Sequence, residues 1–279
     1  MARHGAASVR RPDDETASAA WRRAVEEAGP PTPVRWEPDE VWVKDEDAPG
    51  EAATTAAAGA PGRRPSAGHR FNVPEVVVEE IRGSAGPERG AKLAARLADA
   101  ARAYDHDRYG EARQLLKPLA RQVPDAPAVR ELLGLALYRT GEWAAAVKEL
   151  EAYRQLSGSY DQHPVLADCY RALRRYGPAE EVWDDLRRAS PSAEVVAEGR
   201  IVAAGCRADQ GDLAGAIALL RRADRRMRRP QQHHLRQWYA LADLYERAGD
   251  IPRARDMFAR VAGADGDGYD ARRRLRQLD

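Results

Sequence analysis

A helix, a tight turn and a second helix recur along most of this chain, and this repetition limits the possible folds more than any other feature. The stretch LLGLALYRTGEWAAAVKEL, residues 132–150, places Leu133 and Leu137 one helical turn apart and then breaks at Thr140-Gly141. Helical spacing of apolar residues on both sides of a turn glycine predicts two amphipathic helices. A repeated helical hairpin implies a stacked array, because each hairpin must bury its apolar face against its neighbours.

Copies of this hairpin lie 34 residues upstream and 33, 70 and 108 residues downstream of Gly134, giving five in all. Each has a small residue midway along its first helix: Ala100, Gly134, Ala167, Ala204 and Ala242. Each has a second small residue early in its second helix, followed four positions later by a large one: Ala112/Leu116, Ala146/Leu150, Ala179/Trp183, Ala216/Leu220 and Ala254/Phe258. The small residues let the two helices approach closely, and the large residue fills the groove one turn later.

The fifth copy, WYALADLY (238–245) followed by ARDMF (254–258), resembles the repeat pattern of the tetratricopeptide-repeat family, W-x2-L-G-x2-Y then A-x3-F, with Ala242 in place of glycine. Pro124 and Pro191 match the proline that ends the pattern. The resemblance implies an all-α, right-handed superhelical array of about five helix-turn-helix repeats with a C-terminal capping helix. The alternative is a non-repeating helical bundle whose Ala-rich sequence mimics the pattern. Arginine (41) far outnumbers lysine (4), a bias explained by a GC-rich genome, and we expect a bacterial protein.

The pattern predicts the following boundaries: repeats at 89–125, 126–159, 160–191, 192–230 and 231–267, a capping helix at 268–279, a short helix and linker at 71–88, and an arm at 1–70. In the short helix, Asn72 is the expected cap and Pro74 lies in the first turn, so that Val76, Val77 and Ile81 cover the first repeat. Pro118 should kink or end the second helix of the first repeat.

The arm at residues 1–70 is rich in Pro, Ala, Gly and acidic residues, and we expect it to be largely disordered. Trp36 and Trp42 lie beside or among seven acidic residues between Glu37 and Glu51. Two tryptophans in such a stretch are typical of a short docking motif. The motif would bind the protein's own basic face or a partner, and a chance occurrence is the third alternative.

No arrangement of residues predicts catalysis, a metal or a cofactor. His233 and His234 are adjacent, whereas a helical zinc site needs histidines four residues apart. Cys169 and His163 are six residues apart and are more simply explained by packing, and the sequence has no glycine-rich phosphate loop or GxSxG motif. We therefore expect a non-enzymatic protein. With no apolar run of signal-peptide or membrane-span length and two cysteines, Cys169 and Cys206, a cytoplasmic protein with reduced thiols is predicted.

In the family that the chain resembles, the first helices of successive repeats line a concave groove that holds a partner's peptide segment. Repeat register then implies partner-binding roles for Tyr104, Glu131, Leu135, Tyr138, Arg139, Asp168, Arg171, Arg236, Tyr239, Asp243 and Arg247, and inward positions for Leu97, Ala101, Ile201 and Asp209. Tyrosine supplies rigid contact area and arginine pairs with carboxylates. A solvated helix face is the alternative. A clamp for chaperone carboxylates is excluded, because it needs paired asparagines and the chain's only one is Asn72.

A basic stretch, RRADRRMRRP (221–230), lies at the predicted junction of the fourth and fifth repeats. Its arginines form a possible basic patch: Arg221, Arg222, Arg225, Arg226, Arg228 and Arg229. A nucleic-acid-associated or regulatory role for this patch is the second functional hypothesis. Nucleic acid is the less favoured partner, because no aromatic residues are interleaved to stack on bases and a solvated helix end explains the charges.

Overall fold

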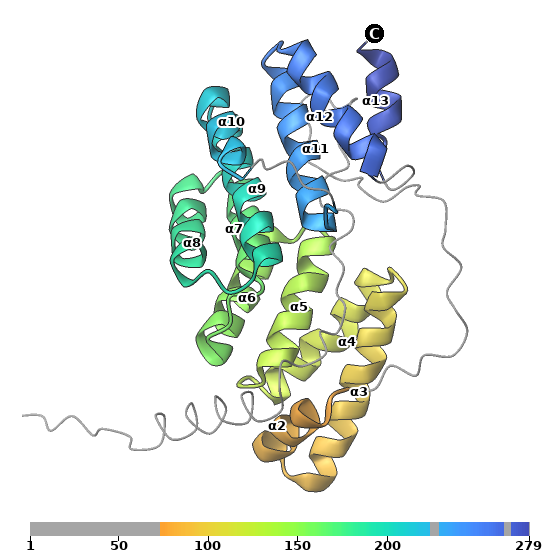
Figure 1. Cartoon of the computed structure of the whole chain (residues 1–279). Helices are drawn as coiled ribbons and strands as arrows, with labels where there is room; N and C mark the ends of the chain where they lie inside the picture. The colour runs from red at the N-terminus through yellow and green to blue at the C-terminus, as the bar shows by residue number, and fades with distance from the viewer. Residues whose placement is uncertain (1–72, 224–228, 265–268, 279) are drawn as a thin grey trace, which may run out of the picture. The chain divides into compact units, whose positions relative to one another are not determined.

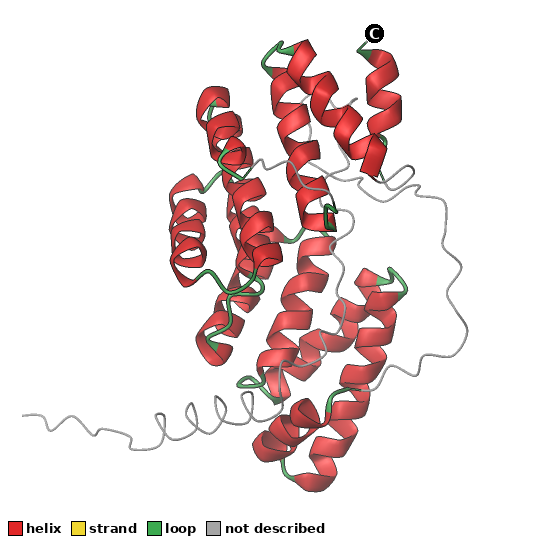
Figure 2. Cartoon of the chain, in the orientation of Figure 1, coloured by secondary structure: helices red, strands yellow, loops and turns green. Residues whose placement is uncertain are grey.

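The computed structural model describes residues 73–223, 229–264 and 269–278, and all regular secondary structure in these ranges is α-helical (Figure 2). The arm with Trp36 and Trp42, the expected cap Asn72 and three arginines of the basic stretch, Arg225, Arg226 and Arg228, lie outside the described residues. The first described helix is α2 (Glu75–Ala85) and the last is α13 (Ala271–Gln277).

Five helix pairs lie between α2 and α13 (Figure 1). They are α3 (Pro87–Asp105) with α4 (Tyr109–Gln122), α5 (Pro127–Arg139) with α6 (Trp143–Ser157), α7 (His163–Ala172) with α8 (Tyr176–Ala189), α9 (Ala193–Asp209) with α10 (Leu213–Arg221), and α11 (Gln232–Arg247) with α12 (Ile251–Ala264). The two helices of each pair pack on each other, and the second also packs on the first helix of the next pair. This stacked arrangement confirms the all-α array that the repeats predict.

The same turn connects the two helices of every pair. One residue in each turn has a positive φ: Asp107, Gly141, Arg174, Gly211 and Gly249. The backbone N–H that follows it donates to a carbonyl five residues earlier, as Glu142 N donates to Leu137 O at 2.9 Å and Asp250 N to Tyr245 O at 2.8 Å. Glycine reaches this conformation without strain, whereas Asp107 and Arg174 carry a side chain into it. The first and third pairs therefore keep the same turn geometry although they have Asp107 and Arg174 in place of glycine.

Close packing at the small residues is as the sequence pattern predicts. Ala100, Ala112, Ala146 and Ala242 have essentially no exposed surface. A Cβ on Gly134 would lie 2.7 Å from the Leu150 side chain, a distance that real Cβ atoms do not show. Glycine at 134 is thus required by the packing of α5 on α6, and Leu150 fills the space that the missing Cβ leaves.

The helix α2 packs on α3 and covers the start of the first pair. Ile81 is fully buried, and a Cβ on Gly90 would lie 2.6 Å from the Cα of Arg82, so the two helices are in close contact. Val76, in contrast, is 37% exposed and does not cover the first pair as predicted. Pro74 is the cap residue itself and not part of the first turn, so the helix begins two residues later than the Asn72 cap would place it.

Pro118 does not end its helix, since α4 runs from Tyr109 to Gln122 through it. Of the two predicted effects of Pro118, a kink or an end of the helix, the end is therefore wrong. Pro118 lies on an exposed part of α4, where water can hydrate the carbonyl oxygen that loses its backbone partner. The packed side of the same helix keeps Leu116 and Leu119 buried.

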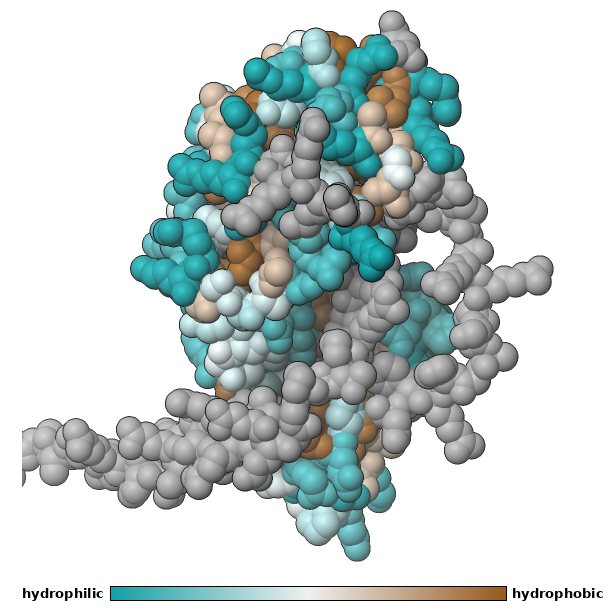
Figure 3. All heavy atoms as spheres, viewed as in Figure 1, coloured by the Kyte–Doolittle hydropathy of each residue, from teal (hydrophilic) through white to brown (hydrophobic). Residues whose placement is uncertain are grey.

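Most of the described atoms visible in Figure 3 belong to hydrophilic residues. Among described residues, the exposed large hydrophobic side chains are Val76 and Leu156. None of the described helices is both long enough and apolar enough to cross a membrane.

Candidate functional site

The candidate site is the row of polar side chains on the first helices of the pairs, which we call the first-helix surface. It consists of the predicted residues that are at least partly exposed: Tyr104, Glu131, Tyr138, Arg139, Asp168, Arg171, Asp209, Arg236, Tyr239, Asp243 and Arg247. These residues come from α3, α5, α7, α9 and α11.

Four apolar residues that register places on this surface lie in the interior. Leu135 is 5% exposed, and Leu97, Ala101 and Ile201 are more deeply buried. The prediction that these four side chains line the groove surface is wrong, because they are buried in the packing between helices. The reason is that a first helix contacts its own second helix on one side and neighbouring pairs on the other, so a wider arc is buried than on a helix with one packed face.

In the middle of the surface, hydrogen bonds join three successive first helices. The Tyr138 hydroxyl on α5 donates to Asp168 Oδ2 on α7 at 2.7 Å. Arg171, one turn further along α7, donates to Asp168 Oδ1 at 2.9 Å and to Asp209 Oδ2 on α9 at 2.6 Å. We call Tyr138, Asp168, Arg171 and Asp209 the polar ladder. It was not predicted that these side chains bind one another across repeats.

The electrostatics of the polar ladder follow from partial burial. Burial raises the pKa of the Tyr138 hydroxyl well above its usual value, and the Asp168 carboxylate beside it raises that pKa further. Burial alone would lower the pKa of Arg171, but Asp168 and Asp209 outweigh this effect and raise it. Both side chains therefore keep their protons at all physiological pH values, and the ladder is a permanent set of donors and acceptors.

At the N-terminal end of the surface, Arg139 on α5 stacks on an aromatic pair. Its guanidinium carbon lies 4.4 Å from the ring centroid of Tyr109, and the rings of Tyr104 and Tyr109 meet edge to face at 5.0 Å. Burial is the main cause that raises the pKa of Tyr104 to about 12. Tyr109, on α4, was not among the predicted residues, and its contribution follows from the cation–π geometry.

Glu131 is the most enclosed acid of the surface. Gln162 Nε2 donates to its Oε1 at 2.8 Å, and burial raises its pKa to about 7. Glu80, on α2, is a related group that sequence reasoning missed. Both of its carboxylate oxygens are buried and have no hydrogen-bond partner in the described structure, and burial followed by the charge of Glu131 raises its pKa to about 8. A carboxyl group in this environment is stable in its protonated form.

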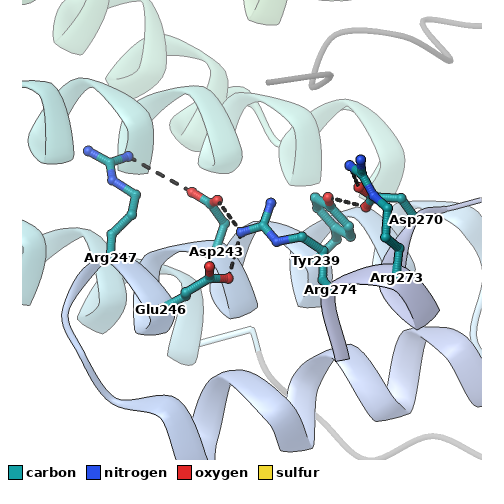
Figure 4. Close-up of polar contacts among 7 residues, drawn as sticks. All are labelled: Tyr239, Asp243, Glu246, Arg247, Asp270, Arg273 and Arg274. Atoms are coloured by element: carbon teal, nitrogen blue, oxygen red, sulfur yellow. Dashed lines mark hydrogen bonds and ion pairs between the residues drawn. The ribbon is translucent and has the colours of Figure 1, made fainter. Parts of the chain in front are cut away.

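The C-terminal end of the surface is bound to α13 (Figure 4). Arg274 donates to Asp243 at 3.2 Å and to Glu246 at 2.6 Å, and Arg247 lies 4.0 Å from the other oxygen of Asp243. The Tyr239 hydroxyl donates to Asp270 at the start of α13 at 2.5 Å. Burial, the hydrogen bond to Asp270 and the charges of Asp270 and Asp243 raise the pKa of Tyr239. Further back on α11, Arg236 forms an ion pair with Glu198 on α9 at 3.2 Å.

Among the described arginines of the basic stretch, Arg221, Arg222 and Arg229 are exposed. Arg221 ends α10 and Arg222 follows it, so these two lie at the end of the fourth pair, whereas Arg229 lies three residues before α11.

The cysteines and the histidines His163 and His233, which the sequence analysis considered as nucleophiles or metal ligands, lie in the interior. Cys169 and Cys206 are buried free thiols, and burial raises the pKa of both. His163 and His233 are also buried, and burial lowers their pKa values. Within the described ranges, no three His, Cys, Asp or Glu side chains are grouped so that they could hold a metal ion.

The described chain is thus an array of helix pairs whose first helices carry a structured polar surface, which is the construction of α-helical repeat scaffolds. Residues 97–161 match the family model for the tetratricopeptide repeat. The structure is similar to the crystal structure of a thermophilic TPR protein from Thermus thermophilus, with a TM-score of 0.54 and 21% identity, over 67% of this chain and 98% of that chain. At this identity the likeness shows the fold alone. No curated protein matches the sequence.

Residues 97–161 thus match the tetratricopeptide repeat in sequence, and the described chain has the fold of a tetratricopeptide-repeat protein. In general such folds are scaffolds for protein–protein interaction and are typically non-enzymatic.

Proposed function

We propose that this protein is a non-enzymatic adaptor that binds a peptide segment of a partner protein along the first-helix surface. The polar ladder is the observation that carries this proposal. Tyr138, Asp168 and Arg171 are partly exposed, yet hydrogen bonds between repeats hold them in place. Side chains that are already fixed lose little conformational entropy when a partner binds, so the surface is pre-organised for recognition.

The charges of the surface favour a partner segment of mixed character. Acidic and basic side chains alternate along it, and most are already paired, as Arg171 is with Asp168 and Arg236 with Glu198. A strongly acidic or strongly basic peptide would meet like charges at every second contact. Tyr104, Tyr109 and Arg139 add aromatic and planar contact area at one end, where an apolar or aromatic side chain of the partner would pack.

Capture of partners from the native lysate with variants of the full chain tests the proposal. The informative variant is Arg139→Gln combined with Arg171→Gln, which changes two helices of the first-helix surface. Arg187→Gln combined with Arg188→Gln is the matched control, because it also replaces two arginines, which form ion pairs at the end of α8. Proteins that the unchanged chain and the control capture should be lost or at least about fivefold depleted with the first variant. Equal recovery on both variants, with both folded by circular dichroism, would contradict the proposal.

A further inference from the structure

A second surface is separate from the first-helix surface and has a different charge. A cavity of about 430 Å³ lies among α4, α5 and α6, the helices labelled at the centre of Figure 1. We call it the basic pocket, and it is lined by Lys117, Ala120, Arg121, Pro124, Arg130, Leu133, Lys148 and Glu149. None of these residues belongs to the first-helix surface.

Positive charge in the basic pocket exceeds negative charge. Among the described residues that line it, the pocket has four cationic side chains and one carboxylate, Glu149, which is bound to Arg130. Arg130 also donates to the Pro124 carbonyl oxygen at 2.8 Å, so this pair is fixed. The negative charge of Glu149 is therefore compensated by Arg130, and Glu149 does not neutralise the other three cations.

The other three cations surround the pocket with little compensation. Lys117 lies 3.5 Å from Glu142, but that carboxylate also binds Arg113. Arg121 and Lys148 are exposed and form no hydrogen bond or ion pair with any residue that the structure describes. Like charges held at one cavity repel one another, so a ligand that brings negative charge is stabilised there.

The inner wall of the pocket is apolar. Leu133 and Ala120 are almost completely buried, and the Pro124 ring lies beside them at the surface. The described residues that line the pocket include no aromatic side chain. Nucleic acids without sequence-specific contacts are held by base stacking on aromatic side chains as well as by charge, so this wall favours an aliphatic group. A volume of this size also exceeds that of a single small anion.

We propose that the basic pocket binds an acidic peptide segment of a partner protein, with carboxylates at Lys117, Arg121 and Lys148 and an aliphatic side chain against Leu133. This surface would give the adaptor a second contact, for a partner chemistry that the first-helix surface disfavours. The proposal does not depend on the peptide-binding role of the first-helix surface, because the two involve different residues.

The small number of lysines makes a direct test possible. The chain has four, Lys44, Lys92, Lys117 and Lys148, and a carbodiimide joins carboxylates to amines that they contact. The probe is a blocked heptapeptide of alternating glutamate and leucine, incubated with the full chain at low salt. Mass spectrometry should find the peptide joined to Lys117 and Lys148. Lys92, which is exposed on α3, is the internal reference and should be joined at least about fivefold less.

Two matched variants keep the test specific. Arg121→Gln leaves both acceptor lysines in place and should lower the yield at Lys148 about two- to fivefold. Arg96→Gln is the control, because Arg96 is exposed and lies four residues from Lys92, as Arg121 does from Lys117. It should leave the yield at Lys148 unchanged.

Three results would overturn the proposal. Equal joining at Lys92 and Lys148 would show unspecific attraction. Joining at Lys148 between two copies of the chain in preference to the peptide, seen by mixing isotope-labelled and unlabelled protein, would make a second copy the occupant. Single-stranded DNA that displaces the peptide at equal anion concentration, while a glutamate homopolymer does not, would make the pocket a nucleic-acid site.

Discussion

Glu80 has an environment that is unusual for a carboxyl group. Its oxygens are buried without partners, and its pKa is raised from 4.5 to about 8. The folded protein therefore keeps a proton that the unfolded chain releases above about pH 4.5. Because the folded state binds more protons between these two values, the free energy of unfolding falls as pH rises from about 4.5 to about 8.

Glu80→Gln should remove this loss of stability. A neutral amide has the shape of the protonated carboxyl and no charge to bury, so the variant should be more stable than the unchanged protein at pH 8 by more than about 1 kcal/mol. At pH 5 the two should differ little. Urea unfolding at both pH values measures this difference. Glu79→Gln is the control, because Glu79 is exposed and paired with Arg82. Parallel stability curves for the unchanged protein and Glu80→Gln would contradict the predicted burial of this proton.

Gly134→Ala should destabilise the protein although alanine favours helices. The new Cβ would lie 2.7 Å from Leu150, and moving that side chain disturbs the buried contact between α5 and α6. We expect a loss of about 1–3 kcal/mol in the free energy of unfolding.

Gly177→Ala serves as the comparison for this glycine. Gly177 is exposed on α8, and a Cβ there meets no atom within 4 Å. The free energy of unfolding of Gly177→Ala should rise by up to about 1 kcal/mol, from the higher helix propensity of alanine alone. Chemical denaturation of both variants separates the two effects, and equal changes at both positions would show that the space beside Leu150 is not restrictive.

At the scale of the helices, the end of the array depends on α13. Arg274 is 4% exposed, pairs with Asp243 and Glu246 on α11, and lies 5.1 Å from the ring centroid of Phe258 on α12. Arg274→Ala removes all of these contacts and leaves two partly buried carboxylates unpaired. We expect a loss of about 1–3 kcal/mol.

Hydrogen exchange locates the effect of Arg274→Ala. Because each pair contacts only its neighbours, amides of α11, α12 and α13 should exchange faster while those of α3 to α6 keep their rates. Arg276→Ala, at an exposed position two residues away, should change neither region. Uniform acceleration along the whole array would contradict a local role for this arginine.

The helix pairs could be predicted because their signal lies in short spacings. Gly134 on the first helix, and Ala146 four residues before Leu150 on the second, indicate which helix faces pack together. No information from distant residues is needed for this prediction. The course of α4 through Pro118 could not be predicted in this way, since it depends on whether the proline faces water or the core. Register also placed Leu135 on the groove surface, although it is buried. The apolar stripe of a single helix does not show how many neighbouring helices pack against it.

At the scale of the whole molecule, the candidate site could be predicted only as a set of positions. Repeat register identified Tyr138, Asp168 and Arg171 as residues of the first helices, and the structure places them together. That they bind one another depends on side-chain conformations and on the offset between consecutive pairs, which a single sequence does not contain. Register also named Asp209, but not its hydrogen bond with Arg171. The basic pocket could not be predicted for the same reason, because its residues are brought together by the packing of different pairs.

The polar ladder also has a mechanical meaning. Arg171 is bound both to Asp168 on its own helix and to Asp209 on the next pair, so the contacts that shape the candidate surface also join the third and fourth pairs. If the proposed peptide binds there and competes for one of these groups, it should change the angle between those two pairs. Binding of a peptide to this surface and the stiffness of the array would therefore depend on the same hydrogen bonds.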